Sequence, residues 1–393
     1  MKRVLCAVLT ALLWSQGMPA AHAAEPVKPA SSGVEVSAKS VILMERETGT
    51  VLYQQAEHEQ REPASVTKIM TMLLVCEAVD AGQISLDDTV TTSPYASSMG
   101  GSEIWLEPYE TMTVDEMLRA TAIASANDAA VALGEHLAGT EAMFADKMNQ
   151  KAAQLGMEST HFVNACGLDE AGHLSTARDV ALMSRELIVQ YPQIHNYSTI
   201  WMDTITHVTR KGESEFGLTN TNKLIKQYQW ATGLKTGSTG LAKCCLSATA
   251  NKDGVELIAV IMAAPDSKTR FSDAVTLLNY GYSVCDIYHD TEMPQLPNLS
   301  VSGGRCDTLS LSYAKEFSTL FLEPVDTASI EKQLTLPETV TAPVNEGDVI
   351  GTLTYTLDGK TIGTVDITAA QSVSSATYGD ALFKMFRKLT GAA

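Results

Sequence analysis

The segment "PASVTKIMTMLLV", residues 63–75, places a lysine at the start of a run that is otherwise apolar. Its apolar spacing predicts a buried helix, on which Ser65 and Lys68, three residues apart, share one face. A charged ammonium is costly to bury unless it is paired, and no carboxylate lies within four residues after Lys68. Burial would therefore lower the pKa of this lysine, and a neutral amine beside a hydroxyl is a general base. By itself, the segment also fits a lysine that reaches out to water.

Two further motifs support the catalytic interpretation: Ser125-Ala126-Asn127 and Lys235-Thr236-Gly237. A serine three residues before a lysine is a weak signal alone, and the chain has a second copy at Ser312 and Lys315. That copy falls in a region predicted to be β-structure, and neither of the other motifs follows it. The three motifs in order, on a predicted helix, a helix–loop junction and a strand, predict a serine acyltransferase site with Ser65 as nucleophile and Lys68 as base.

The remaining motif residues have expected roles that follow from their chemistry. We expect Ser125 to relay a proton to a leaving amine, and Asn127 to hold either Lys68 or a substrate amide. Lys235 and Thr236 fit the recognition of a substrate carboxylate, while Gly237 leaves room for a ligand to lie along the strand edge as an added strand.

The first part of the chain, residues 37–290, is predicted to be an α+β domain. Residues 40–55 and 243–264 each read as a hairpin, with β-favouring runs around Thr48-Gly49 and Asn251-Lys252-Asp253-Gly254. Between them the pattern is mostly helical, with apolar residues at three- and four-residue spacing. We expect the two hairpins to join one antiparallel sheet packed against helices.

The rest of the chain changes character after "TEMPQLPNLS", where two prolines mark a linker at residues 291–299. Short alternating segments and an Asp358-Gly359 turn predict a small all-β domain over residues 300–372. Residues 376–390 are predicted to form an amphipathic helix, with Leu382 and Phe386 on the apolar face and basic residues elsewhere. Such a helix can lie on an anionic membrane surface or pack on the domain as a terminal helix, but it is too short to span a bilayer.

The first 23 residues have the pattern of a secretory signal peptide: Lys2-Arg3, a short apolar run and an Ala-x-Ala site ending at Ala23. Residues 24–36 read as a linker. We therefore expect an exported protein at the outer face of the cytoplasmic membrane, attached peripherally through the C-terminal helix. The formal net charge of −18 argues against binding to nucleic acid, which requires clustered lysine and arginine. The eight histidines form no metal-ligand spacing, so no metal or other cofactor is expected.

The three motifs together resemble the low-molecular-weight penicillin-binding D-alanyl-D-alanine carboxypeptidases, serine peptidases that trim peptidoglycan stem peptides. The resemblance runs from about residue 36 to the C-terminus and includes "PASVTKIMT", "ASANDAAVAL", "STARDVALM" and "TGLKTGSTGLAKCCLSATA". It implies a β-lactamase/transpeptidase-like domain, substrates ending in D-Ala-D-Ala and covalent inhibition by β-lactams.

By the same resemblance, the backbone N–H groups of Ser65 and Ser238 would form an oxyanion hole, and Lys235 would bind substrate. Arg270 would add a further carboxylate contact. The chain departs from the family at Ala126, where glycine is usual.

Three other functions remain open. A β-lactamase shares the motifs but needs a deacylating glutamate, and we find no convincing one between Asn127 and Lys235. A D-Ala–diaminopimelate endopeptidase would usually lack the β-domain and the tail. A non-catalytic sensor of β-lactams or muropeptides would bind and stay acylated.

Overall fold

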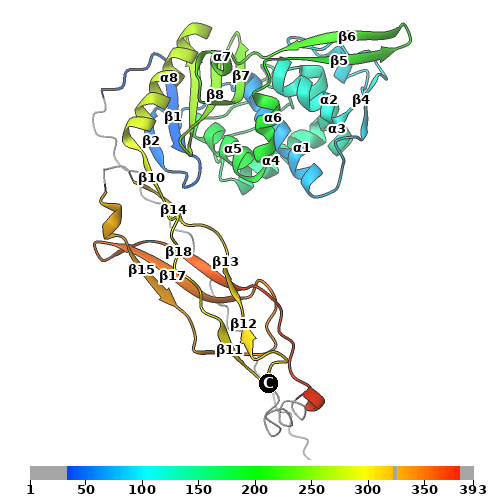
Figure 1. The fold of residues 1–393 in the computed structure, drawn as a ribbon. Helices are drawn as coiled ribbons and strands as arrows, with labels where there is room; N and C mark the ends of the chain where they lie inside the picture. The colour runs from blue at the N-terminus through cyan, green and yellow to red at the C-terminus, as the bar shows by residue number, and fades with distance from the viewer. Residues whose placement is uncertain (1–32, 322–324, 381–393) are drawn as a thin grey trace, which may run out of the picture.

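A five-stranded antiparallel sheet is the centre of the part of the chain that carries the three motifs (Figure 1). The computed structural model describes residues 33–321 and 325–380. The strands lie in the order β2-β1-β9-β8-β7, with bounds β1 Ser40–Glu45, β2 Val51–Gln55, β7 Ala231–Thr239, β8 Lys243–Lys252 and β9 Val255–Ala264. Both predicted hairpins are confirmed, and they join through β1 and β9 as expected.

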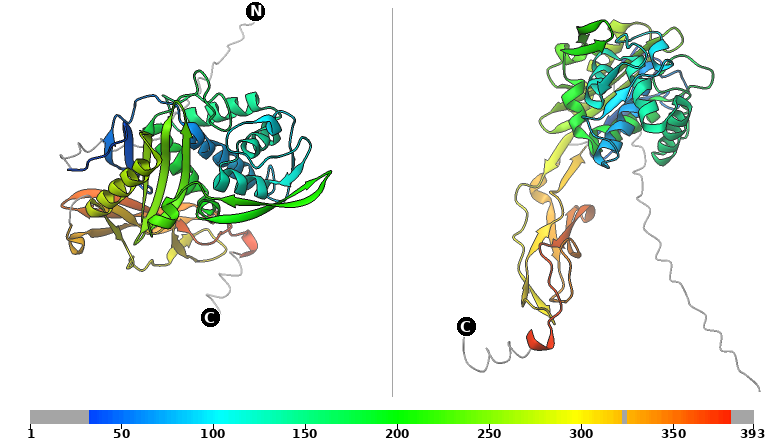
Figure 2. Two further views of the ribbon diagram at one scale, coloured as in Figure 1. Left: turned by 90° about the horizontal axis from the view of Figure 1, so that it is seen from above. Right: turned by 90° about the vertical axis from the view of Figure 1, so that its right-hand side faces the viewer.

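The two faces of this sheet bury different sets of side chains, as the two-residue period of a strand requires. In β9, Ile258, Val260 and Met262 belong to the core shared with the helical block, whereas Leu257 and Ile261 face the other way. On that second side the sheet is covered by α8 (Ser267–Val284), and Figure 2 shows the helical block on the opposite side. The sheet is therefore buried on both faces, with β7 at its edge.

The helical block contains the predicted helices. Their bounds are α1 Lys68–Asp80, α2 Val114–Arg119, α3 Asn127–Ala138, α4 Glu141–Gln154 and α5 Ala177–Gln190, with short helices α6 His195–Ser198 and α7 Leu224–Gln227 and short strands β3 Thr89–Thr91 and β4 Thr111–Thr113. The periodic segment around the second motif is not one continuous helix. A π-helical turn, Ala120–Ala124, ends α2, and Ser125 then adopts a left-handed conformation before α3 begins.

A long hairpin of β5 (Met202–Thr209) and β6 (Gly212–Thr219) was missed, because we expected mostly helix between the two predicted hairpins. Its signal was present in the alternating stretch "TITHVT" before Lys211-Gly212. The two strands pair with each other in a sheet of their own, and Figure 1 shows the hairpin projecting beyond the helical block.

The C-terminal part is built from strands, as expected, and extends away from the first part in Figure 1 and in the right-hand view of Figure 2. Its elements are β11 Leu299–Ser302, β12 Thr308–Leu309, β13 Leu311–Tyr313, β15 Glu331–Thr335, β16 Thr339–Thr341, β17 Val349–Leu357 and β18 Lys360–Ala369. The predicted turn at Asp358-Gly359 joins β17 and β18, with positive φ at both residues. Tyr355 stacks on Phe317 at 3.7 Å in the core of this part.

The connection between the two parts is a pair of strands, not only an irregular linker. β10 (Asp286–His289) leaves α8 and pairs antiparallel with β14 (Ser318–Phe321). Asp290, the residue after β10, accepts hydrogen bonds from Lys332 Nζ at 2.7 Å and from the Tyr355 hydroxyl at 2.7 Å. The chain is thus hydrogen-bonded to the C-terminal β-structure before it reaches the two prolines of the predicted linker.

Two predicted segments lie wholly or partly outside the residues that the structure describes. The signal peptide expected at residues 1–23 lies outside the described residues, and so does the expected amphipathic helix from residue 381 onward. Among the residues that the structure does describe, no helix combines the length and the hydrophobicity needed to cross a membrane.

Candidate active site

Ser65 and Lys68 lie together where the chain enters α1. Ser65 belongs to a 3-10 turn, Ala64–Thr67, which continues directly into the helix that begins at Lys68. The Lys68 Nζ atom donates a hydrogen bond to Ser65 Oγ over 3.0 Å. The predicted pairing of these two side chains on one helical face is therefore present, although the serine lies on the tighter turn.

The ammonium position of Lys68 is fully buried and is surrounded by uncharged oxygen atoms. Besides Ser65, Nζ bonds to Asn127 Oδ1 at 2.6 Å and to the backbone oxygen of Cys166 at 2.8 Å. Burial is the main cause that lowers the pKa of Lys68 to about 8, and the nearby Cys166 and Asp128 oppose the shift. This site stabilises a lysine that can lose its proton near neutral pH.

Asn127 is the first residue of α3, and the loop before β4 holds it in place. Its Nδ2 donates to the Gly100 oxygen at 2.6 Å, and its backbone N–H donates to the Ser102 oxygen at 2.7 Å. We expected Asn127 to hold either Lys68 or a substrate amide, and in the structure its Oδ1 accepts a hydrogen bond from Lys68. Ser125 precedes it at φ 63°, a conformation that is uncommon for serine.

Ala126 does not need the glycine that the family usually has there. Its φ of −58° and ψ of 121° are open to any residue, and its side chain is fully buried. The departure is thus compatible with this loop.

Lys235 and Thr236 lie on β7, at the edge of the central sheet. Lys235 is 1% exposed, and its Nζ donates to the Thr236 oxygen at 3.1 Å. Burial, followed by repulsion from Lys68 and Arg270, holds the pKa of Lys235 well below its usual range. Thr236 Oγ1 lies 2.6 Å from the hydroxyl of Thr221, a neighbour that the sequence analysis missed.

Gly237 lets β7 lie against the backbone of the nucleophile. A Cβ atom at this position would stand 2.8 Å from the Ser65 nitrogen and 3.0 Å from the Val66 nitrogen. Real Cβ atoms essentially never approach backbone atoms so closely, so a larger residue would push β7 away from Ser65. The third motif is therefore joined to the first through direct backbone contact.

Ser238 and Arg270 flank this contact. The Ser238 hydroxyl is exposed and donates to the Lys243 oxygen at 2.8 Å across the β7–β8 turn. Arg270, on α8, directs one terminal nitrogen at the backbone oxygens of Gly237, at 3.0 Å, and Cys245, at 3.3 Å. Its buried guanidinium thus braces the end of β7 from beneath the sheet.

A loop to which the sequence assigned no role completes the surroundings of Lys68. Within "NACGLD", residues 164–169, Asn164 Oδ1 accepts from the backbone N–H groups of Cys166 and Gly167. A Cβ atom at Gly167, which has φ 87°, would stand 1.9 Å from the Ala64 oxygen. The glycine therefore allows the loop to pack against the turn that carries Ser65.

His173 supports the same region as a neutral side chain. Its Nδ1 accepts the backbone N–H of Val163 at 3.0 Å, so its Nε2–H donates to Thr67 Oγ1 at 2.8 Å. Burial lowers the pKa of His173 to about 4, and this histidine stays uncharged at neutral pH. It is therefore a structural brace, not a proton carrier.

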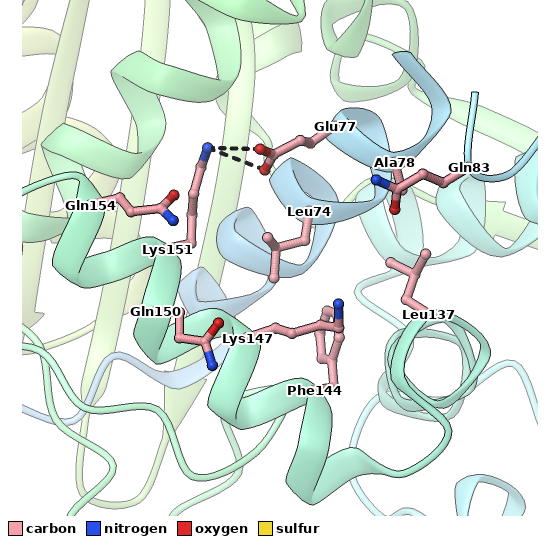
Figure 3. A pocket seen from close by; sticks show the side chains of 10 residues that line it. All are labelled: Leu74, Glu77, Ala78, Gln83, Leu137, Phe144, Lys147, Gln150, Lys151 and Gln154. Carbon is pink, nitrogen blue, oxygen red and sulfur yellow. Dashed lines mark hydrogen bonds and ion pairs between the residues drawn. The ribbon is translucent and has the colours of Figure 1, made fainter. Parts of the chain in front are cut away.

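Other candidate positions are separate from this cluster. The second serine–lysine copy is in the C-terminal part, where Ser312 lies on β13 and is exposed. A separate cavity lies between α1 and α4, and none of the residues that line it belongs to the three motifs or to the second serine–lysine copy. In this cavity Lys151 pairs with Glu77 at 3.1 Å (Figure 3). In the described ranges, no group of three His, Cys, Asp or Glu side chains could hold a metal ion.

Comparison with known proteins gives two family matches. Residues 23–266 match the model for D-alanyl-D-alanine carboxypeptidases, and residues 291–375 match the C-terminal domain of penicillin-binding protein 5. The chain is 39% identical over 379 residues to D-alanyl-D-alanine carboxypeptidase DacF of Bacillus subtilis, with 96% of each chain covered. It is 32% identical to DacC of Escherichia coli, with 88% of this chain and 85% of that one covered.

The solved structures agree with these matches. Penicillin-binding protein 5 from Haemophilus influenzae superposes with a TM-score of 0.68 at 27% identity, covering 89% of this chain and all of that one. Penicillin-binding protein 6B from Escherichia coli gives a TM-score of 0.65 at 28% identity, covering 87% of this chain and 97% of that one.

Lys68 generates a prediction about pH. The rate at which a fluorescent penicillin acylates Ser65 should rise about tenfold per pH unit below pH 8 and level off above it, because only the neutral amine accepts the serine proton. Lys68→Arg, which cannot become neutral, should acylate at least about 100-fold more slowly at pH 8. Lys147→Arg, on the exposed face of α4, is the matched control and should retain the wild-type rate. A wild-type rate that is flat from pH 6 to 9 would contradict the role of Lys68 as a base.

Proposed function

The chain belongs to the D-alanyl-D-alanine carboxypeptidase family, and from this premise we propose that it removes the terminal D-alanine from peptidoglycan stem pentapeptides through an acyl-enzyme on Ser65. The observation that carries the assignment of Ser65 is the 3.0 Å hydrogen bond from the buried Lys68 Nζ atom. Penicillins inhibit the enzyme by acylating the same hydroxyl.

The acylation step follows from the neighbours of Ser65. Lys68 Nζ, in its neutral form, takes the proton of Ser65 Oγ as this oxygen attacks the carbonyl of the penultimate D-alanine. The backbone N–H groups of Ser65 and Ser238 stabilise the negative oxygen of the tetrahedral intermediate. Ser125 donates its proton to the amine of the departing D-alanine and regains one from the Lys68 ammonium. Water then hydrolyses the ester, and one of its protons passes through Lys68 to Ser65 Oγ, which restores the enzyme. Asn127 keeps Lys68 in position through its 2.6 Å hydrogen bond.

Lys235, Thr236 and Arg270 recognise the carboxylate of the terminal D-alanine in this proposal. A buried lysine without an anionic partner has a low pKa, and an arriving carboxylate restores its charged form. The substrate then lies beside β7, the edge strand, as an added strand. The room expected at Gly237 is taken by the backbone of Ser65 and Val66, so the glycine serves the close approach of β7 to the nucleophile. This arrangement makes a free C-terminal carboxylate part of what the enzyme recognises.

The proposal extends to the cellular location of the enzyme. Residues 1–23 would direct export and be removed, and residues 24–36 and 291–299 would serve as linkers on either side of a catalytic domain at 37–290. The β-domain at 300–372 would hold this domain above the outer face of the cytoplasmic membrane. The helix at 376–390 would bind the anionic surface peripherally.

Ser65→Ala should abolish covalent labelling by fluorescent penicillin, because no hydroxyl remains to be acylated. The same variant should release no D-alanine from a muramyl pentapeptide, while the wild type should yield the tetrapeptide by mass spectrometry. Ser312→Ala, in the second serine–lysine copy, is the control and should behave as the wild type. Full labelling of Ser65→Ala would refute the assignment. A wild type that stays acylated without turnover would indicate a sensor, and one that cleaves cross-linked dimers would indicate an endopeptidase.

Lys235 should matter only for substrates with a free terminal carboxylate. Amidating the terminal D-alanine should lower kcat/KM sharply in the wild type and little in Lys235→Ala, because the charge that the carboxylate needs is already missing in the variant. Steady-state kinetics on the acid and amide forms of one peptide give the comparison. Equal losses in both enzymes would show that Lys235 does not pair with this carboxylate.

Truncation after Ser375 should release the protein from anionic vesicles in a flotation assay and leave hydrolysis of a soluble D-Ala-D-Ala tripeptide intact. The basic and apolar side chains of the tail supply the attraction, at about 1 kcal/mol per basic residue near an anionic surface. High salt should weaken binding of the full chain without abolishing it, since only the electrostatic part is screened. A truncated protein that still floats with the vesicles would rule out this membrane role.

A further inference from the structure

Two exposed aromatic residues, Trp105 and Tyr109, stand out in the loop that leads to β4. Their exposed fractions are 69% and 68%, and both have φ in the left-handed region, at 63° and 68°. Bulky residues rarely adopt this conformation, and they keep it only where the surroundings impose it, as they do at ligand clamps.

The loop is held by buried contacts on either side of Trp105. Ile104 and Leu106 are buried, and their backbone N–H groups donate to the carboxylate of Asp128 at 3.2 Å and 3.1 Å. Asp128 is buried and follows Asn127 on α3. Its effect is to fix both neighbours of Trp105, so that the indole is directed away from the core.

A cavity of about 410 Å³ lies between this loop and the β5–β6 hairpin. The residues that line it include Trp105, Glu107, His207, Lys211, Ser214 and Phe216. Its volume is within the range of about 300–1,000 Å³ that is typical of small-molecule sites. The hairpin thus supplies a second wall, and the lining combines aromatic rings with side chains that can hydrogen-bond.

The polar groups of this lining disfavour an anionic ligand, since Glu213 adds a carboxylate to it. Lys211 Nζ pairs with Glu107 at 2.6 Å, which leaves no free positive charge for an anion. His207, which is 6% exposed, pairs through Nδ1 with Glu110 at 2.7 Å, while its Nε2 has no hydrogen-bond partner among the described residues. A ligand with hydroxyl and amide groups would suit this lining better than a phosphate or a carboxylate.

The cavity lies close to the proposed catalytic residues along the same loop. The Ser102 oxygen accepts the backbone N–H of Asn127 at 2.7 Å, and Trp105 follows only three residues later. Three residues span at most about 10 Å, and the four stem residues before the scissile bond span at most about 14 Å. A ligand group attached to the far end of a bound stem peptide can therefore reach Trp105.

We propose that this cavity binds the amino-sugar part of a muropeptide while its stem peptide lies at Ser65, an inference that rests on the proposed function. A sugar ring has an apolar C–H face that can stack on the Trp105 indole, and a rim of hydroxyl and N-acetyl groups. Thr209, Ser214 and the Glu107–Lys211 pair can hydrogen-bond to that rim. The enzyme would then distinguish stem peptides attached to glycan from free peptides.

The experiment compares kcat/KM for a free pentapeptide with kcat/KM for the same peptide on a GlcNAc–MurNAc disaccharide. The ratio should favour the disaccharide substrate in the wild type, and Trp105→Asn should lower that ratio about tenfold, because an aromatic stack and its burial are lost. Asparagine tolerates the left-handed conformation, so the loop keeps its backbone. Trp105→Tyr should retain most of the preference.

Tyr109→Asn is the matched control. Tyr109 has nearly the same exposure and backbone conformation, but it lines a neighbouring cavity with Val208, whose side chain points to the other face of β5. The two cavities share Glu107 and Thr209, and Tyr109 lines only the second one. Its substitution should leave the ratio as it is in the wild type. A ratio that is unchanged in Trp105→Asn, or that falls equally in both variants, would overturn the proposal.

A binding measurement separates this inference from the proposed function. The disaccharide alone, without a peptide, should quench tryptophan fluorescence in the wild type and not in Trp105→Asn. If the wild type fails to hydrolyse either peptide, the proposed function fails, yet the quenching still tests the cavity. If hydrolysis is normal and the disaccharide causes no quenching, the sugar site is refuted while the carboxypeptidase stands.

Discussion

The burial of the Lys68 amine among uncharged oxygens is the constraint on which the rest of the active site depends. Lowering the pKa of this lysine from 10.5 to about 8 costs the folded state about 3 kcal/mol at neutral pH, where the unfolded chain carries the charge in water. The cost disappears only above pH 10.5, where both states are neutral. A carboxylate beside Lys68 would remove this cost in stability at lower pH. The same carboxylate would also keep the lysine protonated and unable to act as a base.

The fold meets this constraint by bringing three separate segments against one turn. α1 supplies Lys68, the start of α3 supplies the Asn127 oxygen, and the loop before α5 supplies the Cys166 carbonyl. Two glycines make the approach possible, since Gly167 and Gly237 each lie where a Cβ atom would overlap the backbone around Ser65. The central sheet, buried on both faces, provides the rigid edge on which the third motif is presented.

The supporting residues share a common feature: each is buried, polar and satisfied mainly by backbone groups. Asn164 and His173 bond to the loop that closes over Lys68, and Asp128 bonds to the loop that carries Trp105. Side chains of this kind carry no recognisable motif, because their partners are main-chain atoms that any residue can provide. For that reason sequence reasoning predicted Asn127 as a partner of Lys68 but missed Asn164, His173 and Asp128.

The sequence by itself determined the three motifs that we propose to carry the chemistry, the two hairpins of the central sheet and the β-structure of the C-terminal part, since these depend on local spacing and turn residues. It could not determine which atoms surround the Lys68 amine, because Asn127 and Cys166 lie 59 and 98 residues away along the chain. Nor did it separate the β5–β6 hairpin from its helical surroundings, although this hairpin forms one wall of the cavity beside Trp105. Those features depend on contacts between distant segments, which only the folded chain brings within hydrogen-bonding distance.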